Sequence, residues 1–151
     1  GSVVIRGMTE DDLPHLIKMG ERFYNETPEY KLYKFEKAKL QELGWRCLTE
    51  PDSICLVYDK KGIKGMLAGG VYEQFFSFDL TASELFLFVE KTARGALIGK
   101  RLITGFEFWA NSMGARETRV GVSSAIKTDR TIGFYKTLGY CETANILRKE
   151  L

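Results

Sequence analysis

The sequence contains few of the residues that build disulfide frameworks or metal sites. Its 151 residues include three cysteines and a single histidine. Because Cys47, Cys55 and Cys141 are odd in number and widely spaced, neither a disulfide framework nor a paired-cysteine metal knuckle is expected. His15 lies off the apolar stripe of its predicted helix, so it is interpreted as a solvated helix residue and not as a zinc ligand. We therefore expect a protein without a metal, in a reducing, cytoplasmic compartment.

Long apolar runs and a strong net charge are also absent. No run approaches the length of a membrane span, and no basic segment followed by an apolar one precedes the first predicted strand, so no membrane partner is expected. The 22 Lys and Arg against 20 Asp and Glu give a net charge of +2, which argues against nucleic acid as a partner. Gly1-Ser2 is interpreted as a remnant of expression, and residues 3–151 are predicted to form one domain with one core. The sequence leaves a homodimer open.

The stretch from Glu84 to Gly114 predicts a strand, a glycine turn and a long helix. Leu85–Val89 is an unbroken apolar run of strand length, typical of an inner strand covered on both faces. From Leu97 to Met113 apolar residues recur every three or four positions, which predicts a helix lying on the sheet and ending at Gly114. The turn between the two elements, residues 94–100, combines glycines with basic side chains at a helix start. Backbone N–H groups bind anions at such a place, so the turn is a candidate phosphate site, with a turn that binds nothing as the alternative.

The other elements follow from the same kind of reading. Bulges or close backbone approaches are predicted in the strand Ile63–Phe78, the second strand of a predicted hairpin, because it contains Gly65, Gly69 and Gly70. The predicted elements are a strand at Val3–Ile5, a helix from Thr9 to about Asn25, a loop at Asn25–Lys34, a helix at Phe35–Thr49, hairpin strands at Ser53–Tyr58 and Ile63–Phe78, a strand at Thr118–Val122, a helix at Thr128–Leu138 and a closing strand at Tyr140–Arg148. Alternation of strands and helices on this pattern predicts an α/β fold.

Two nucleotide-binding motifs fail at the glycine turn. Gly95 and Gly99 are separated by three residues, and Arg101 follows Lys100, so the Walker pattern is absent. The dinucleotide pattern G-x-G-x-x-G is absent as well.

A third pattern fits better. The run V-x4-R-x4-G-K, from Val89 through Arg94 to Gly99 and Lys100, resembles the acyl-CoA pyrophosphate loop of the GNAT superfamily of N-acyltransferases, whose usual form is R/Q-x-x-G-x-G/A. Leu97 stands where the middle glycine is usual. About forty residues further on, Gly133–Tyr140 reads GFYKTLGY and resembles the x-F-Y-x-x-L-G-F signature of the same family. The predicted order of elements agrees with that family over nearly the whole chain.

This resemblance implies a fold and an activity. The fold would be a mixed, mostly antiparallel central sheet flanked by helices, with splayed central strands. The activity would be transfer of an acetyl or short acyl group from acetyl-CoA to a primary amine by direct attack in a ternary complex. The sequence does not identify the amine acceptor, and a small molecule or a peptide fits equally. A non-catalytic relative that binds CoA or serves as an interaction module is the rival hypothesis, favoured by Leu97 and by Thr128, where the family often has asparagine.

The resemblance also implies roles for particular residues. Tyr135 matches the frequent general acid of the family, since a phenol is suited to protonating a thiolate. Glu84, at the mouth of the strand, is the candidate base, with Glu73 as a second candidate on the acceptor side. Tyr30 and Tyr33 either line an acceptor pocket or pin their loop to the core. A backbone N–H near Val89 is the candidate for stabilising the oxyanion. The coenzyme would lie on Leu87, Phe88, Val89, Arg94, Gly95, Ala96, Leu97, Ile98, Gly99 and Lys100.

Overall fold

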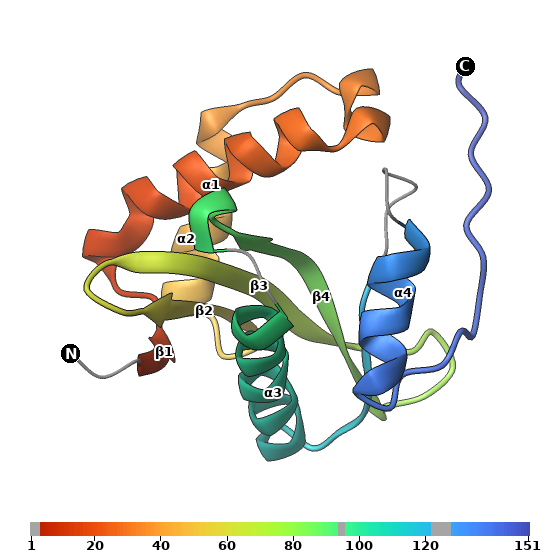
Figure 1. Ribbon diagram of the computed structural model, residues 1–151. Coiled ribbons are helices and arrows are strands. Elements are labelled where there is room, and N and C mark those ends of the chain that lie inside the picture. Colours follow the sequence, from red (N-terminus) through yellow and green to blue (C-terminus); the bar gives the residue numbers. More distant parts are fainter. Residues whose placement is uncertain (1–3, 94–95, 122–127) are drawn as a thin grey trace.

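The elements of the chain follow the predicted order closely. A computed structural model describes residues 4–93, 96–121 and 128–151 (Figure 1). Its strands are β1 (Val4–Gly7), β2 (Ser53–Asp59), β3 (Ile63–Glu73), β4 (Leu80–Val89) and β5 (Ala115–Arg119). Its helices are α1 (Leu13–Glu26), α2 (Lys37–Thr49), α3 (Ala96–Ser112) and α4 (Thr128–Thr137), with short 3-10 turns η1 (Glu10–Asp12), η2 (Pro28–Leu32) and η3 (Lys91–Ala93).

The five strands form one sheet in the order β1-β2-β3-β4-β5. The first four strands pair antiparallel, and β5 joins β4 in parallel after the α3 crossover. The predicted mixed, mostly antiparallel sheet is therefore confirmed. In Figure 1 α1 and α2 lie on one side of the sheet and α3 and α4 on the other.

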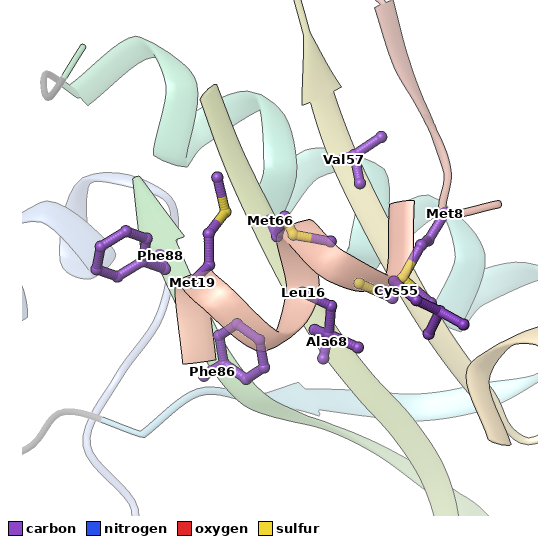
Figure 2. Packing of buried hydrophobic residues seen from close by; sticks show 10 residues of the cluster. Met8, Leu16, Met19, Cys55, Val57, Met66, Ala68, Phe86 and Phe88 are labelled. Carbon is purple, nitrogen blue, oxygen red and sulfur yellow. The ribbon is translucent and has the colours of Figure 1, made fainter. Parts of the chain in front are cut away.

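Strand residues alternate between two apolar clusters, one on each face of the sheet. On β2, Cys55 and Val57 face the α1 and α2 side, and Leu56 and Tyr58 face the α3 and α4 side. Figure 2 shows the first cluster, in which Leu16 and Met19 of α1 meet side chains of β2, β3 and β4. The second cluster gathers the buried residues of α3 with Tyr135 of α4. Burial of both faces fixes the register of the sheet, because a slip of one residue would exchange the two sets.

The start of α1 is fixed by ion pairs and a capping box. Asp12 accepts hydrogen bonds from the Thr9 backbone N–H at 2.8 Å and from the Thr9 hydroxyl at 3.1 Å. The Arg6 guanidinium on β1 pairs with Asp12 at 2.7 Å and with Asp59 at the end of β2 at 3.1 Å. The network joins the start of α1 to two strands.

Strand β4 pairs with β3 over more residues than it pairs with β5. Its register with β5 ends at Ser83 opposite Arg119, whereas its register with β3 continues to Val89 opposite Gly65. Beyond Ser83, the edge of β4 turned away from β3 is therefore not covered by β5 within the described residues. This arrangement confirms the predicted splaying of the strands.

The hairpin between β3 and β4 differs from the prediction. The predicted strand Ile63–Phe78 ends at Glu73, because the chain turns where the Ser77 N–H donates to the Gln74 carbonyl at 3.2 Å. Phe75 is consequently 98% exposed, and Phe76 and Phe78 are exposed beside it. Aromatic residues favour strands, but here the turn prevails over that preference.

Two further strand predictions need correction. The fifth strand lies at Ala115–Arg119, not at Thr118–Val122, because Gly114 ends α3 at a positive φ of 81° and lets the chain enter β5 at once. Leu85 is exposed although its run predicted burial on both faces. The cause is a bulge, since Ala68 pairs with Phe86 and Gly69 with Glu84, so Leu85 has no opposite residue on β3.

The predicted closing strand at Tyr140–Arg148 is absent. Residues 140–151 contain no helix or strand, and from Cys141 onward every residue is exposed. Its apolar residues Ile146 and Leu147 are adjacent and do not alternate, so no single strand face could bury both.

Candidate active site

Glu84 lies where β4 and β5 cease to pair. It follows Ser83, the last residue of β4 in register with β5, and stands beside the bulge opposite Gly69. Its Oε2 accepts a hydrogen bond from the backbone N–H of Gly121 at 3.1 Å. Burial raises the pKa of its carboxyl from about 4.5 to about 7, with the Gly121 hydrogen bond opposing this shift. Glu84 can therefore exchange a proton near neutral pH.

Tyr135 of α4 carries a buried ring in the second apolar cluster. The side chain is 6% exposed and packs edge-on against Phe134 and Tyr140, at ring centroid distances of 5.2 and 5.6 Å. Burial first, and then the charge of Glu84, raise the pKa of this phenol above 10, so it is protonated at neutral pH.

The two candidate acceptor tyrosines differ in their surroundings. The ring of Tyr30 in η2 lies 5.6 Å from that of Phe23, and its pKa is raised by burial and by the charges of Glu29 and Glu84. Tyr33 is 64% exposed, and its carbonyl accepts a hydrogen bond from the Tyr24 hydroxyl at 2.6 Å. The charge of Glu84 thus acts on the Tyr30 phenol, whereas the Tyr33 side chain is exposed to solvent.

Glu73 is not brought to this group of residues. It is exposed and pairs with Leu80 at the end of the β3–β4 hairpin, whereas Glu84 lies opposite Gly69. Four residues along β3 separate the two positions, which corresponds to about 13 Å.

The candidate coenzyme residues fall on β4 and at the start of α3. Leu87, Phe88 and Val89 lie on the part of β4 that is in register with β3 and beyond its register with β5. Phe88 is buried toward α1, and Leu87 and Val89 pack on the α3 side.

The start of α3 suits a phosphate group. This helix has 17 residues and begins at Ala96, so the N–H groups of its first four residues, Ala96 to Gly99, have no partner within the helix. Leu97 and Lys100 are exposed, whereas Ile98 and Gly99 are buried. A Cβ atom on Gly99 would lie 3.4 Å from Phe134, so α3 and α4 approach closely here. The other two predicted phosphate residues, Arg94 and Gly95, lie outside the described residues.

Sequence reasoning missed two residues beside Glu84. Gly121 contributes a backbone N–H, and no sequence signal identifies which backbone group meets a given side chain. The Tyr140 hydroxyl lies 2.8 Å from Thr118 Oγ1, and burial raises the pKa of this phenol to about 12. Tyr140 was predicted only as a core aromatic of the second motif, and this hydrogen bond ties the end of α4 to β5.

A cavity of about 320 Å³ lies on the α1 side of β4. Arg22 and Glu90, which form an ion pair, both line it. Its lining residues are Arg22, Asn25, Glu26, Phe88, Glu90 and Lys91.

No described helix is both long enough and apolar enough to cross a membrane. No group of three or more His, Cys, Asp or Glu side chains in that part of the chain is placed to hold a metal ion.

The sequence matches the model of the acetyltransferase (GNAT) family over residues 20–140. The chain belongs to this family. The resemblance of the glycine turn and of the Gly133–Tyr140 motif is thereby confirmed at the level of the family. As a GNAT protein, it transfers an acetyl group from acetyl-CoA to an amine.

Solved structures share the fold of this GNAT protein. An aminoglycoside acetyltransferase, HMB0005, from an uncultured soil metagenomic sample is 21% identical, with a TM-score of 0.75 over 100% of this chain and 99% of the other. AAC(6')-Iy in complex with the bisubstrate analogue CoA-S-monomethyl-acetylneamine is 17% identical, with a TM-score of 0.78 over 100% and 99%. Glucosamine-6-phosphate N-acetyltransferase from Arabidopsis thaliana is 14% identical, with a TM-score of 0.76 over 99% of each chain. No curated protein matches the sequence.

Proposed function

We propose that this protein acetylates a small cationic amine by direct attack on acetyl-CoA in a ternary complex. The observation that carries the proposal is the position of Glu84. Its carboxyl lies where β4 and β5 diverge, is held by the Gly121 N–H at 3.1 Å, and has a pKa of about 7. A group with this pKa is suited to general base catalysis at neutral pH.

The coenzyme would lie between Glu84 and the start of α3. Leu87–Val89 of β4 would lie beside the pantetheine arm, and the first turn of α3 with Lys100 would hold the pyrophosphate. Arg94 and Gly95 are proposed to complete that turn. This placement directs the thioester toward the region between Glu84 and Tyr135.

In the proposed reaction every proton has a donor and an acceptor among the substrates, the two side chains and solvent. Glu84 accepts a proton from the bound ammonium, directly or through water, and the neutral amine attacks the thioester carbonyl. Tyr135 donates its proton to the leaving sulfur as the C–S bond breaks, and the tyrosinate then accepts the proton that the new amide nitrogen must lose. The proton on Glu84 passes to solvent. Burial keeps Tyr135 in the protonated form that this step requires.

The acceptor is proposed to carry positive charge. Glu29 and Glu84 both act on Tyr30, so the acceptor side of the site is acidic. An acidic wall favours a cationic ligand and disfavours an anionic one. Among proteins with this fold, meta-AAC0020 was crystallised with sisomicin, and the plant enzyme is named for glucosamine 6-phosphate. We propose an acceptor of the first kind and a cytoplasmic location, where the free thiols of Cys47 and Cys55 stay reduced.

The test is release of CoA thiol from acetyl-CoA in the presence of sisomicin, spermidine, a lysine-bearing peptide or glucosamine 6-phosphate. Sisomicin or spermidine should give the highest kcat/KM. Preference for glucosamine 6-phosphate would overturn the cationic acceptor. Absence of thiol release with every amine, together with no thermal stabilisation by acetyl-CoA, would overturn the proposed function.

A further inference from the structure

The C-terminal tail, residues 141–151, connects two walls of the candidate site. Near its base, Glu142 pairs with Lys136 of α4 at 3.3 Å. Near its end, Arg148 Nη1 donates a hydrogen bond to the backbone carbonyl of Glu29 at 2.6 Å. Figure 1 shows the tail leaving the end of α4 and running beside that helix toward the level of the α1–α2 connection. The tail therefore spans from the helix that carries Tyr135 to the turn that carries Tyr30.

The turn η2 is otherwise tied to its own neighbour in sequence. The Tyr24 hydroxyl donates to the Tyr33 carbonyl at 2.6 Å. Lys31 Nζ lies 4.3 Å from the centre of the Tyr24 ring and donates to the Tyr24 carbonyl at 3.3 Å. These contacts hold η2 to the end of α1. Arg148 adds a contact from a segment 119 residues away.

We propose that Arg148 is a positioning residue for the acceptor, acting through the Glu29 carbonyl to hold Tyr30 beside Glu84. This inference rests on the proposed function of the site. Glu29 immediately precedes Tyr30, so a bond to its carbonyl restrains the backbone that carries the Tyr30 ring. Loss of the bond removes one restraint on η2, and the acceptor must then supply more of its order on binding.

The expected effect is modest because the contact lies at the surface. A single charge-assisted hydrogen bond at an exposed site changes an equilibrium by about three- to tenfold. Arg148 also brings positive charge near the acidic acceptor wall, and loss of that charge alone would favour a cationic acceptor. The two effects have opposite signs, so they can be separated.

Lys149 provides the matched control. It is the next residue of the same tail and exposed, and Lys149→Ala removes the same charge as Arg148→Ala. Arg148→Lys keeps the charge and one possible donor to the Glu29 carbonyl.

The experiment compares the full-length wild-type protein with these three variants in two measurements. The first is hydrogen exchange of the η2 amides, whose N–H groups at Tyr30 and Tyr33 bond to the carbonyls of Thr27 and Tyr30 at 3.0 and 2.9 Å. The second is steady-state kinetics with sisomicin and acetyl-CoA. In Arg148→Ala we expect exchange at least threefold faster in η2 and a three- to tenfold higher KM for sisomicin, with kcat and the KM for acetyl-CoA within twofold. Arg148→Lys and Lys149→Ala should both stay within twofold of wild type.

Three different results would contradict the contact, the positioning role and the proposed function. Equal η2 exchange in Arg148→Ala and Lys149→Ala would overturn the contact. Faster exchange with an unchanged KM for sisomicin would overturn the positioning role. Lack of thiol release by the wild-type protein would overturn the proposed function and the effect on KM with it, while the exchange comparison would still decide the contact by itself.

Discussion

The backbone N–H of Gly121 bonds to the carboxylate of Glu84 across the point where β4 and β5 stop pairing. The last register pair, Ser83 with Arg119, is followed on β4 by Glu84 and on the other segment by Val120 and Gly121. This hydrogen bond therefore holds a titratable group just beyond the last register pair of the two strands.

The pH dependence of turnover should report Glu84. Because its pKa is raised to about 7, the carboxylate that accepts the proton forms only as the pH rises through 7. We expect kcat/KM to rise about tenfold per pH unit below pH 7 and to level above it, since kcat/KM reports the pKa of the free protein. Glu84→Gln should lower kcat by about 10²-fold and remove this limb. An unchanged profile in Glu84→Gln would exclude Glu84 as the base.

Tyr135→Phe should separate chemistry from binding. The phenylalanine ring keeps the buried packing against Phe134 and Tyr140 but cannot donate a proton. We expect kcat to fall by about 10²–10⁴ with the affinity for acetyl-CoA unchanged, measured by calorimetry. Tyr140→Phe is the matched control, since it removes a phenol that bonds to Thr118. It should cost about 1 kcal/mol of unfolding free energy and leave turnover nearly intact. Unchanged turnover in Tyr135→Phe would exclude Tyr135 as the general acid.

Lys100 should contribute to coenzyme affinity. Binding of acetyl-CoA at a hundredfold excess over its dissociation constant should stabilise the wild-type protein by about 2.7 kcal/mol. In Lys100→Ala the dissociation constant should rise about three- to tenfold, because one cation at the start of α3 is lost. Arg116→Ala, at the other end of the sheet, removes equal charge and should not change the affinity. Equal affinities in the two variants would exclude a direct role of Lys100.

Asp12→Asn should destabilise the fold in a pH-dependent way. The hydrogen bond from Arg6 holds the pKa of Asp12 below its usual 3.8. The carboxylate therefore stabilises the fold above that pH, and this contribution disappears as the pH falls through the lowered pKa. At pH 7 we expect Asp12→Asn to lose about 1–3 kcal/mol in urea unfolding, with the difference from wild type shrinking below pH 4. The exposed neighbour Asp11→Asn should have little effect at either pH.

Local patterns predicted most of the elements. The apolar spacing from Leu97 to Met113, with Gly114 behind it, set the bounds of α3 within one or two residues. The Phe134–Tyr135 pair was placed on the last helix, where the structure has it. These signals depend on neighbours within a few positions, so sequence alone carries them.

Features that depend on register or on distant contacts were not predicted. Glu73 was a second candidate base after Glu84 in sequence, and only the β3–β4 pairing puts Glu73 at the far end of the hairpin. The bulge at Ala68 and Gly69 was foreseen as an irregularity, but its effect on Leu85 required the partner strand. The tail was predicted as a strand. Its contact between Arg148 and the Glu29 carbonyl was missed, because no residue near Arg148 in sequence indicates a partner 119 positions away.

The short parallel pairing of β5 also bears on how the molecule assembles. Strands β2, β3 and β4 are joined by short hairpin connections and can pair from neighbouring segments, whereas β5 reaches β4 only after the whole of α3. Because its pairing with β4 is non-local and has four matched positions, we expect it to form after the hairpins. Local opening of this pairing would release the Gly121 donor beside Glu84 without unfolding the hairpins, and product would then leave past the end of β5.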